Sequence, residues 1–254
     1  MLLLIIIVLA FIVLSFCYMF YTAQRDHLRF HKFTDSQYPS QIPLRIFFIS
    51  DIHNRIIKES TMHGVEDVDV VIIGGDLVDK RTSASKLKSN LHQLLKLDAP
   101  IYFIPGNNDH EYQEGNLISL LNDYNIGTLS NDDRILDAKD NSFLLSGLDP
   151  YFLRPRRMMS AAIEDTDYFQ VLCVHDPYVF ERMNVEDKKK FHLVLSGHTH
   201  GGQIRVLGMG PYQRGVFRSM ESQTILVSEG YGTSVFPLRF GTRAECHILE
   251  VSKP

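Results

Sequence analysis

Leu195–Gln203 reads LSGHTHGGQ and completes an apolar run that begins at Phe191. A short apolar run that ends in glycine and histidine is typical of a buried strand followed by a tight loop. His198 and His200 belong either to a polar surface loop or to a pair of metal ligands, because histidine is the commonest metal-binding side chain. The glycines around them would let the backbone bend until both imidazoles converge. The rest of the chain decides between these interpretations.

Four further apolar runs end in the same way. LRIFFIS (44–50) is followed by Asp51 and His53, VDVVII (68–73) by GGD, IYFIP (101–105) by GNND, and FQVLCV (169–174) by His175. Helix-like segments at 84–96 and 117–124 lie between them, and this alternation predicts an α/β fold. Ligands of open α/β sheets bind beyond the carboxyl ends of the strands. Asp and Asn are common in turns, but five such endings together predict one site.

The side chains at these endings are imidazoles, carboxylates and an amide, without cysteine. Such a mixed nitrogen and oxygen set suits divalent Mn, Fe or Zn. There are more ligands than one tetrahedral ion needs, and a carboxylate between two ions can hold them about 3.5–4 Å apart. The sequence therefore predicts two divalent metal ions, with His198 and His200 each directed to one of them.

The motifs D-x-H, GGD, GN-x-D, a lone His and GHTHGGQ, in this order, resemble those of the calcineurin-like metallophosphoesterases. The resemblance spans about residues 45–250. GHTHGGQI and VSEGYGTSVFPLRFGTRAE are more similar to a membrane-associated bacterial branch that includes UDP-diacylglucosamine pyrophosphatase-like phosphodiesterases. This resemblance implies a four-layer α/β/β/α sandwich with an N-terminal transmembrane helix. It also implies that a metal-bridging hydroxide hydrolyses a phosphodiester or pyrophosphate bond, on a lipid-linked or nucleotide-linked substrate.

The resemblance further implies a role for each metal ligand. One ion would be bound by Asp51, His53 and His200, the second by Asn107, His175 and His198, and Asp76 would bridge the two.

One position departs from the family pattern GNH[DE], whose histidine helps to protonate the leaving oxygen. This chain has Asn108 there, followed by Asp109 and His110, and these three are the candidate catalytic residues. An amide cannot act as a general acid, and His110 could substitute only from a different spacing. General acid catalysis contributes about 10²–10⁴-fold, so its loss would favour leaving groups that need no proton, such as phosphates and aryl oxides.

Two other functions are compatible with the motifs. Asn108 could mark a metal-binding pseudoenzyme or scaffold at the membrane, but the seven intact ligand positions argue against lost catalysis. A protein phosphomonoesterase is disfavoured because a seryl alkoxide leaves poorly without an acid.

The N-terminal stretch from Leu2 to about Tyr21 is apolar and long enough to cross a bilayer as a helix. A signal peptide would have a basic start and small residues at a cleavage site, which this stretch lacks. We predict a transmembrane anchor at residues 1–23, a juxtamembrane linker at 24–44 and a catalytic domain at 45–254. Arg25, Arg29 and Lys32 follow the anchor, so the domain is expected on the cytoplasmic side of the cell membrane.

Composition adds weaker limits. The net charge of −4 does not favour nucleic acid as a partner, and three cysteines without a CxxC pair do not predict a disulfide framework. Arg205 is a candidate phosphate ligand because it follows GGQI. Arg154, Arg156 and Arg157 either bind phosphate or anionic headgroups or form a solvated basic turn. Tyr151, Phe152 and Phe236 either line a lipid-facing groove or belong to the core.

Overall fold

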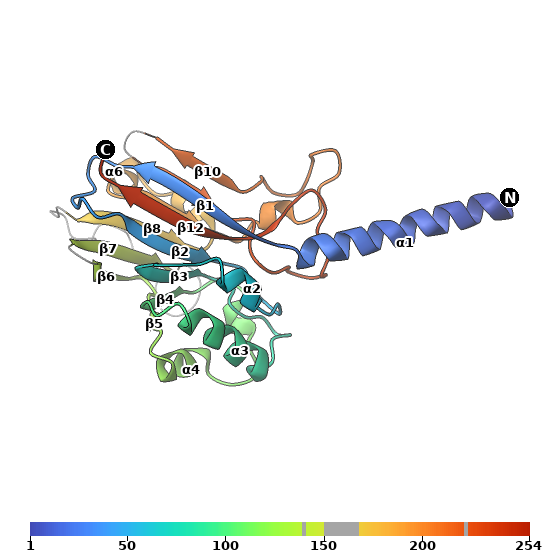
Figure 1. Cartoon of the computed structure of the whole chain (residues 1–254), viewed down its shortest axis with the longest axis horizontal. Coiled ribbons are helices and arrows are strands. Elements are labelled where there is room, and N and C mark those ends of the chain that lie inside the picture. Colours follow the sequence, from blue (N-terminus) through green and yellow to red (C-terminus); the bar gives the residue numbers. More distant parts are fainter. Residues whose placement is uncertain (139–140, 150–167, 221–222) are drawn as a thin grey trace.

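The computed structural model describes residues 1–138, 141–149, 168–220 and 223–254. Two six-stranded sheets stack face to face, and helices cover the outer face of each sheet (Figure 1). This is the four-layer α/β/β/α sandwich that the resemblance implied, and the N-terminal apolar helix projects from one end of it.

The first sheet has the strand order β1-β12-β2-β3-β4-β5. Strands β2 to β5 are parallel neighbours, β12 runs antiparallel to β2, and β1 runs parallel to β12. The strands are β1 (Asp26–Thr34), β2 (Leu44–Ile49), β3 (Val70–Gly74), β4 (Ile101–Ile104), β5 (Gly127–Thr128) and β12 (Ala244–Ser252). Its outer face packs against α2 (Glu59–Met62), α3 (Ala84–Leu95) and α4 (Leu117–Asp123).

The second sheet has the order β10-β11-β9-β8-β7-β6, with β11, β9, β8 and β7 parallel. Its strands are β6 (Asp132–Ala138), β7 (Asn141–Leu148), β8 (Phe169–Val174), β9 (Leu193–Ser196), β10 (Val216–Ser219) and β11 (Thr224–Val227). The short helices α5 (Pro177–Glu181) and α6 (Val185–Lys189) lie on its outer side, where Phe180 joins the outer core. Two 3-10 turns, η1 (Asp109–Glu111) and η2 (His200–Gly202), follow β4 and β9.

The central strands are apolar at nearly every position because both faces of each sheet are buried. On β2, Phe47 packs toward the helices while Phe48 packs between the sheets. On β8, Val171 lies between the sheets while Leu172 packs toward the outer helices. Successive side chains of a strand point to opposite faces, so these continuous apolar runs serve two cores at once.

The first strand corrects the predicted linker at 24–44. Residues 26–34 form β1, which pairs with β12 over its whole length. The sequence DHLRFHKFT does not predict this strand, because its charged side chains obscure the alternation of apolar and polar residues. Two of them are paired across the strands, Arg29 with Glu245 and Lys32 with Glu250, while Phe33 is buried between the sheets.

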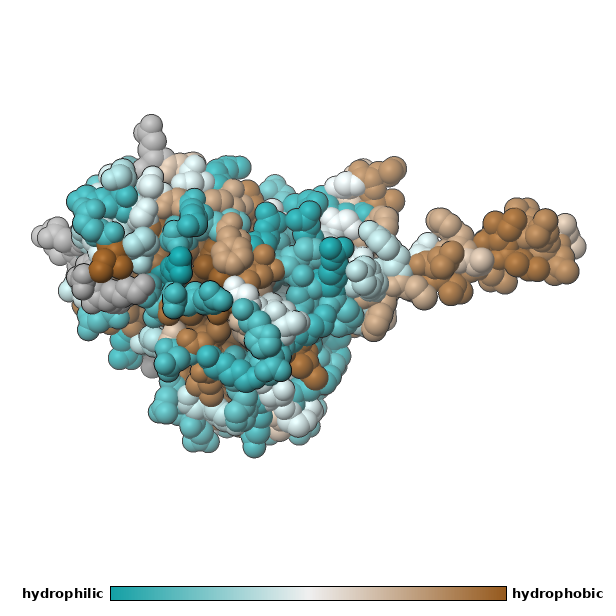
Figure 2. All heavy atoms as spheres, in the orientation of Figure 1, coloured by the Kyte–Doolittle hydropathy of each residue, from teal (hydrophilic) through white to brown (hydrophobic). Residues whose placement is uncertain are grey.

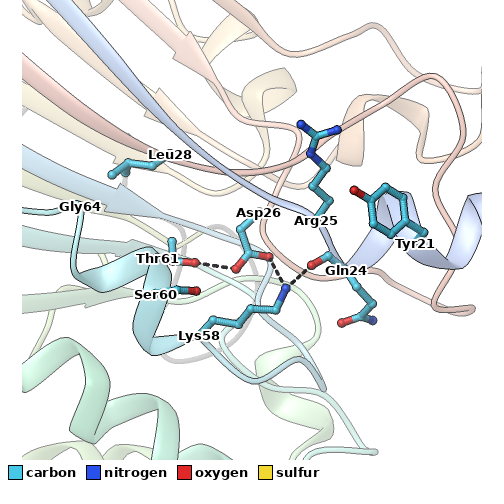
Figure 3. Close-up of a pocket in the computed structure, with 9 residues that line it drawn as sticks. All are labelled: Tyr21, Gln24, Arg25, Asp26, Leu28, Lys58, Ser60, Thr61 and Gly64. Carbon is cyan, nitrogen blue, oxygen red and sulfur yellow. Dashed lines mark hydrogen bonds and ion pairs between the residues drawn. The ribbon is translucent and has the colours of Figure 1, made fainter.

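Helix α1 (Leu2–Gln24) is long and apolar enough to span a membrane, and no side chain in its most hydrophobic window is buried. Figure 2 shows it as a continuous hydrophobic rod. Where α1 meets the domain, Asp26 accepts a hydrogen bond from Thr61 Oγ1 and pairs with Lys58 (Figure 3). Asp26 also accepts a hydrogen bond from Tyr231 OH and pairs with Arg55. The base of the helix is therefore tied to the first sheet by charged contacts.

Candidate metal centre

The predicted ligands come from the carboxyl ends of five strands, two of which belong to the second sheet. Asp51 and His53 follow β2, Asp76 follows β3, and Asn107 follows β4. His175 follows β8, and the pair His198 and His200 follows β9. Because the two sheets stack, these loops face one another, and the structure brings six of the seven predicted ligands together in two groups, all except Asn107.

The first group consists of Asp51, His53 and His200, all of them buried. His200 Nε2 lies 3.4 Å from Asp51 Oδ1 and 3.1 Å from His53 Nε2. Asp51 is fixed by two donors, since Ser50 Oγ and the His198 amide both donate to its carboxylate. Three nitrogen and oxygen donors therefore converge without another side chain between them.

The second group consists of Asp76, His175 and His198. His175 Nε2 lies 3.2 Å from Asp76 Oδ2, and the same oxygen lies 3.7 Å from His53 Nε2 in the first group. Asn107 precedes Asn108, whose amide donates to Asp76 Oδ1, and the buried Oδ1 of Asn107 has no hydrogen-bond partner. The Asp76 carboxylate thus lies between the two groups.

The backbone at the site is held in an uncommon conformation. Five of the seven predicted ligands have positive φ angles: Asp51 (54°), His53 (50°), Asp76 (50°), His198 (69°) and His200 (48°). A non-glycine residue in this region costs of order 1–3 kcal/mol, and such residues gather at functional sites. At Gly197 a Cβ atom would lie 2.4 Å from Asp51 Oδ2, so this position needs glycine for the close approach.

Partners outside the predicted set orient two of the imidazoles. His175 Nδ1 is 2.8 Å from the Gly74 carbonyl, and His53 Nδ1 is 3.4 Å from Asp79 Oδ2. A proton on His175 Nδ1, donated to this carbonyl, leaves Nε2 as the lone-pair atom facing the site. The Asp79 carboxylate favours the same tautomer of His53 by its charge, although His53 Nδ1 makes no hydrogen bond. Asp79 was missed by the sequence analysis, because a single Asp just after GGDLV has no motif of its own.

Arg239 is a second residue that the sequence did not single out. Its guanidinium is fully buried and donates to the carbonyls of Glu229, Gly230 and Gly232. It also lies 3.3 Å from His200 Nδ1. Arg239 therefore holds the loop after β11 against the first group of ligands.

The electrostatics favour a cation at the site. Burial acts to raise the pKa of Asp76, but the neighbouring His175 and His53 outweigh it and lower the pKa to about 2. Burial acts to lower the pKa of His175, but Asp76 and Asp51 outweigh it and raise the pKa to about 10. The field of the two carboxylates that holds a proton on His175 would equally attract a metal ion. His175 Nε2 and Asn107 Oδ1 are buried polar atoms without a hydrogen-bond partner, so the donor set fits divalent ions.

The three candidate catalytic residues have different positions. Asn108 is half-buried and lines a cavity of about 290 Å³ together with His53, Asp79 and Lys80. The Asp109 carboxylate is buried and accepts hydrogen bonds from the amides of Asp76, Val78 and Gly106. Asp109 is therefore a positioning residue that ties two ligand loops together, and not a group in the cavity. His110 is exposed on η1 and does not line this cavity.

The remaining sequence candidates contribute little to the site. The Arg205 guanidinium donates to the carbonyls of Gly201, Gly208 and Tyr212, so it holds its own loop and the phosphate role predicted for it is not supported. Arg154, Arg156, Arg157, Tyr151 and Phe152 lie outside the described residues.

A second opening reaches the site at His198. A groove of about 810 Å³ runs from His198 between α5 and β10. Aromatic side chains and two arginines line it, namely Tyr178, Phe180, Tyr212, Arg214 and Arg218. The site is thus accessible through two openings with different linings.

This fold and this donor set define a metal-dependent phosphoesterase, and the chain belongs to the calcineurin-like phosphoesterase family, whose profile matches residues 44–202. The chain is similar to the uncharacterized protein YpbG of Bacillus subtilis, with 34% identity over 239 residues that cover 93% of this chain and 92% of that protein. An uncharacterized metallophosphoesterase of Helicobacter pylori (strain J99) is 31% identical and covers 82% of this chain, which spans 60% of it.

A third relative is the "Transmembrane protein with metallophosphoesterase domain" of Bos taurus, 29% identical over 82% of this chain and 52% of that protein. The chain thus spans about half of this relative. Membership of the family makes the chain a hydrolase that acts on phosphoesters and uses divalent metal ions. The apolar α1 and the transmembrane relatives support association with a membrane.

Proposed function

We propose that the chain is a two-metal phosphoesterase that hydrolyses a phosphodiester or pyrophosphate bond. The residues that hold the ions are Asp51, His53 and His200 in one group and Asn107, His175 and His198 in the other. Asp76 serves both ions. The observation that carries this proposal is the position of Asp76 Oδ2, 3.7 Å from His53 Nε2 and 3.2 Å from His175 Nε2.

When bound, two such ions would supply positive charge to the phosphoryl oxygens and would activate a water molecule. The chain itself keeps the ligands in place: Asp79 and the Gly74 carbonyl hold the rings of His53 and His175 with Nε2 toward the site. The Asn108 amide and the Lys80 ammonium line the cavity next to His53, where both can donate hydrogen bonds to phosphate oxygens.

The substrate preference follows from Asn108. An amide cannot protonate a leaving alkoxide, and His110 lies outside the cavity. Leaving groups that depart as stable anions, such as a phosphate, avoid this requirement. The groove of about 810 Å³ that begins at His198 is large enough for the part of a substrate that does not react, and its aromatic and arginine lining suits a lipid-linked or nucleotide-linked diphosphate.

A substrate panel tests this function. The full chain, purified in detergent and loaded with Mn²⁺, is assayed on bis-p-nitrophenyl phosphate, p-nitrophenyl phosphate, UDP-sugars, lipid pyrophosphates and a phosphoserine peptide. We expect diesters and pyrophosphates to be hydrolysed well ahead of the phosphoserine peptide, and the same preparation of Asp76→Ala to be inactive on all of them. A phosphoserine peptide as the best substrate would overturn the proposed substrate class.

We further propose that residues 1–23 anchor the chain in the cell membrane, with a catalytic domain that includes β1 and lies on the cytoplasmic side. The charges that support this orientation are Arg25, Arg29 and Lys32, which follow the helix. Protease added to intact cells should leave the domain whole, and digestion under those conditions would contradict the orientation.

A further inference from the structure

Two loops at the base of α1 expose large apolar side chains. The first is residues 204–212 and the second is residues 233–240. We call the five most exposed of these side chains the apolar rim: Val206 (59% exposed), Leu207 (90%), Met209 (71%), Val235 (67%) and Phe236 (63%). Figure 2 shows apolar areas on the domain where α1 meets it. The two loops are neighbours, joined by a bridge between Ile204 and Phe240, and exposed apolar side chains gathered in this way mark an interaction surface.

Hydrogen bonds within and between the two loops hold the apolar rim in place. Residues Ile204 and Phe240 form a β-bridge between the two loops, and the Gln203 side chain accepts from the Ser234 amide and donates to the Phe236 carbonyl. The Arg205 guanidinium closes the first loop by binding carbonyls on either side of it. At the tip, Leu207 has a φ angle of 50°, which a bulky residue adopts rarely. The fold therefore keeps Leu207 exposed although both its backbone conformation and its contact with water are unfavourable.

The same loops contact α1 within its apolar stretch. The Arg239 amide donates to the Met19 carbonyl at 3.0 Å, and the Phe240 ring meets the Tyr18 ring edge-on at a centroid distance of 6.1 Å. Met19 lies five residues before the end of α1, which is about 8 Å along the helix axis. If α1 spans a bilayer, the loops lie beside its last turns and not below them in water.

Polar markers place the membrane boundary at the same level. Tyr21 and Arg25 follow the contact with the loops, and Figure 3 shows both at the junction of α1 and β1. Tyr is enriched where a transmembrane helix leaves the hydrocarbon, and Arg extends into the headgroups. The rim is thus at the depth where interfacial segments bury their apolar side chains, about 5–10 Å into the boundary layer.

We propose that the apolar rim inserts into the interfacial layer of the leaflet on the domain's side of the membrane, as a second membrane contact beside α1. The proposal rests on α1 spanning the bilayer and does not depend on the metal chemistry.

This contact would orient the active site toward lipid. Ser234 and Val235 line the cavity that contains His53 and Asn108, and Tyr212 lines the groove that begins at His198. Both openings are therefore bordered by the membrane-inserted loops, so a phosphate at headgroup level could reach the site without the lipid leaving the leaflet.

Site-specific fluorescence measures the depth of the rim. In a Cys17→Ala background the two remaining cysteines, Cys173 and Cys246, are buried. An environment-sensitive label is placed on Leu207→Cys or Phe236→Cys in the full chain, reconstituted in phosphatidylcholine–phosphatidylglycerol vesicles with or without doxyl-labelled lipid. Ile7→Cys in the apolar stretch of α1 is the membrane reference. Val185→Cys, equally exposed (62%) but on α6 at the opposite end of the domain, is the water reference.

We expect doxyl lipid to quench the labels at positions 207 and 236 at least twofold, as at position 7, and to leave position 185 unchanged. Leu207→Asp should reduce the quenching at position 236, whereas Val185→Asp should not. Quenching at position 7 with water-like signals at 207 and 236 overturns the rim contact alone. A water-like signal at position 7 overturns the anchor, and the rim contact with it.

Discussion

Asp76 Oδ2 lies 3.2 Å from His175 Nε2, and this contact joins the two sheets at the centre of the site. Asp76 ends β3 of the first sheet and His175 ends β8 of the second. The contact requires the intervening backbone to be close: a Cβ atom on Gly75 would lie 2.4 Å from His175 Nδ1. The geometry of the metal centre therefore depends on how closely the two sheets approach one another.

Gly75→Ala should disrupt the centre without touching a ligand. The added methyl group would displace the His175 ring, and Gly75 has a φ angle of 85° that alanine adopts poorly. We expect a loss of metal affinity of at least tenfold and a lower melting temperature. Gly115→Ala is the control, because Gly115 also has a positive φ angle (135°) but no atom within 4 Å of its would-be Cβ. Equal effects of the two variants would show that only backbone strain matters.

Asp79→Asn should weaken metal binding through His53. The amide can no longer fix the proton on Nδ1, and loss of such a partner costs about 10–100-fold in metal affinity. Arg81 also pairs with the Asp79 carboxylate, and Arg81→Gln leaves that carboxylate beside His53, so this variant should bind metal nearly as wild type does. Isothermal titration with Mn²⁺ measures both. Wild-type metal affinity in Asp79→Asn would show that Asp79 does not support metal binding through His53.

Asn108→His should restore activity on alkyl esters. If Asn108 replaces a general acid, wild-type rates should depend steeply on the pKa of the leaving group, with aryl esters and pyrophosphates ahead of alkyl esters. The new imidazole should raise alkyl turnover and flatten this dependence. The gain would be modest if the ring is not held in the productive pose.

The competing explanation is that His110 supplies the proton. It predicts that His110→Ala selectively slows alkyl esters, while Asn108→His slows every substrate. A leaving-group series on wild type and both variants separates the two. A flat series in wild type that collapses in His110→Ala would refute the role given to Asn108.

Much of the site could be predicted because its residues follow strands that are visible as apolar runs. Asp51, Asp76 and His175 each end such a run, and parallel strands bring their carboxyl ends to one edge. Asp79 and Arg239 could not be predicted in this way, because their roles come from contacts with His53 and His200 that no local pattern encodes. Their partners are set by how the loops pack.

The first strand was missed for a related reason. The residues of β1 carry His, Arg and Lys, and their partners on β12 lie more than two hundred residues away in the sequence. The pairing of Arg29 with Glu245 becomes visible only in the fold. A polar segment after an apolar helix is interpreted as a linker until the strand with which it pairs is known.

His31 should make the domain sensitive to acid. His31 Nε2 is 3.1 Å from His247 Nδ1, and burial lowers the pKa of His31 to about 4 from an ordinary 6.5. The unfolded chain binds this proton below pH 6.5 but the folded chain only below pH 4, so stability falls as pH drops through that window. The pKa difference between the two states corresponds to a loss of about 3 kcal/mol once both states are protonated.

Thermal denaturation between pH 7 and pH 4 tests this. His31→Gln should show a shallower loss of melting temperature over the window than wild type. His63→Gln, at an exposed position after α2, should keep the wild-type slope. The same slope in all three proteins would mean that other groups control the acid response.

The metal content of Asp76→Ala tests the central claim most directly. Full-length wild type, loaded with Mn²⁺ and freed of excess metal, should contain about two ions per chain by elemental analysis, as in other two-metal sites. Asp76→Ala should contain fewer than about one ion and hydrolyse no bis-p-nitrophenyl phosphate, since one carboxylate serves both groups. Asp123→Ala, at the exposed end of α4, should match wild type. Two retained ions and full activity in Asp76→Ala would contradict a centre built around a shared carboxylate.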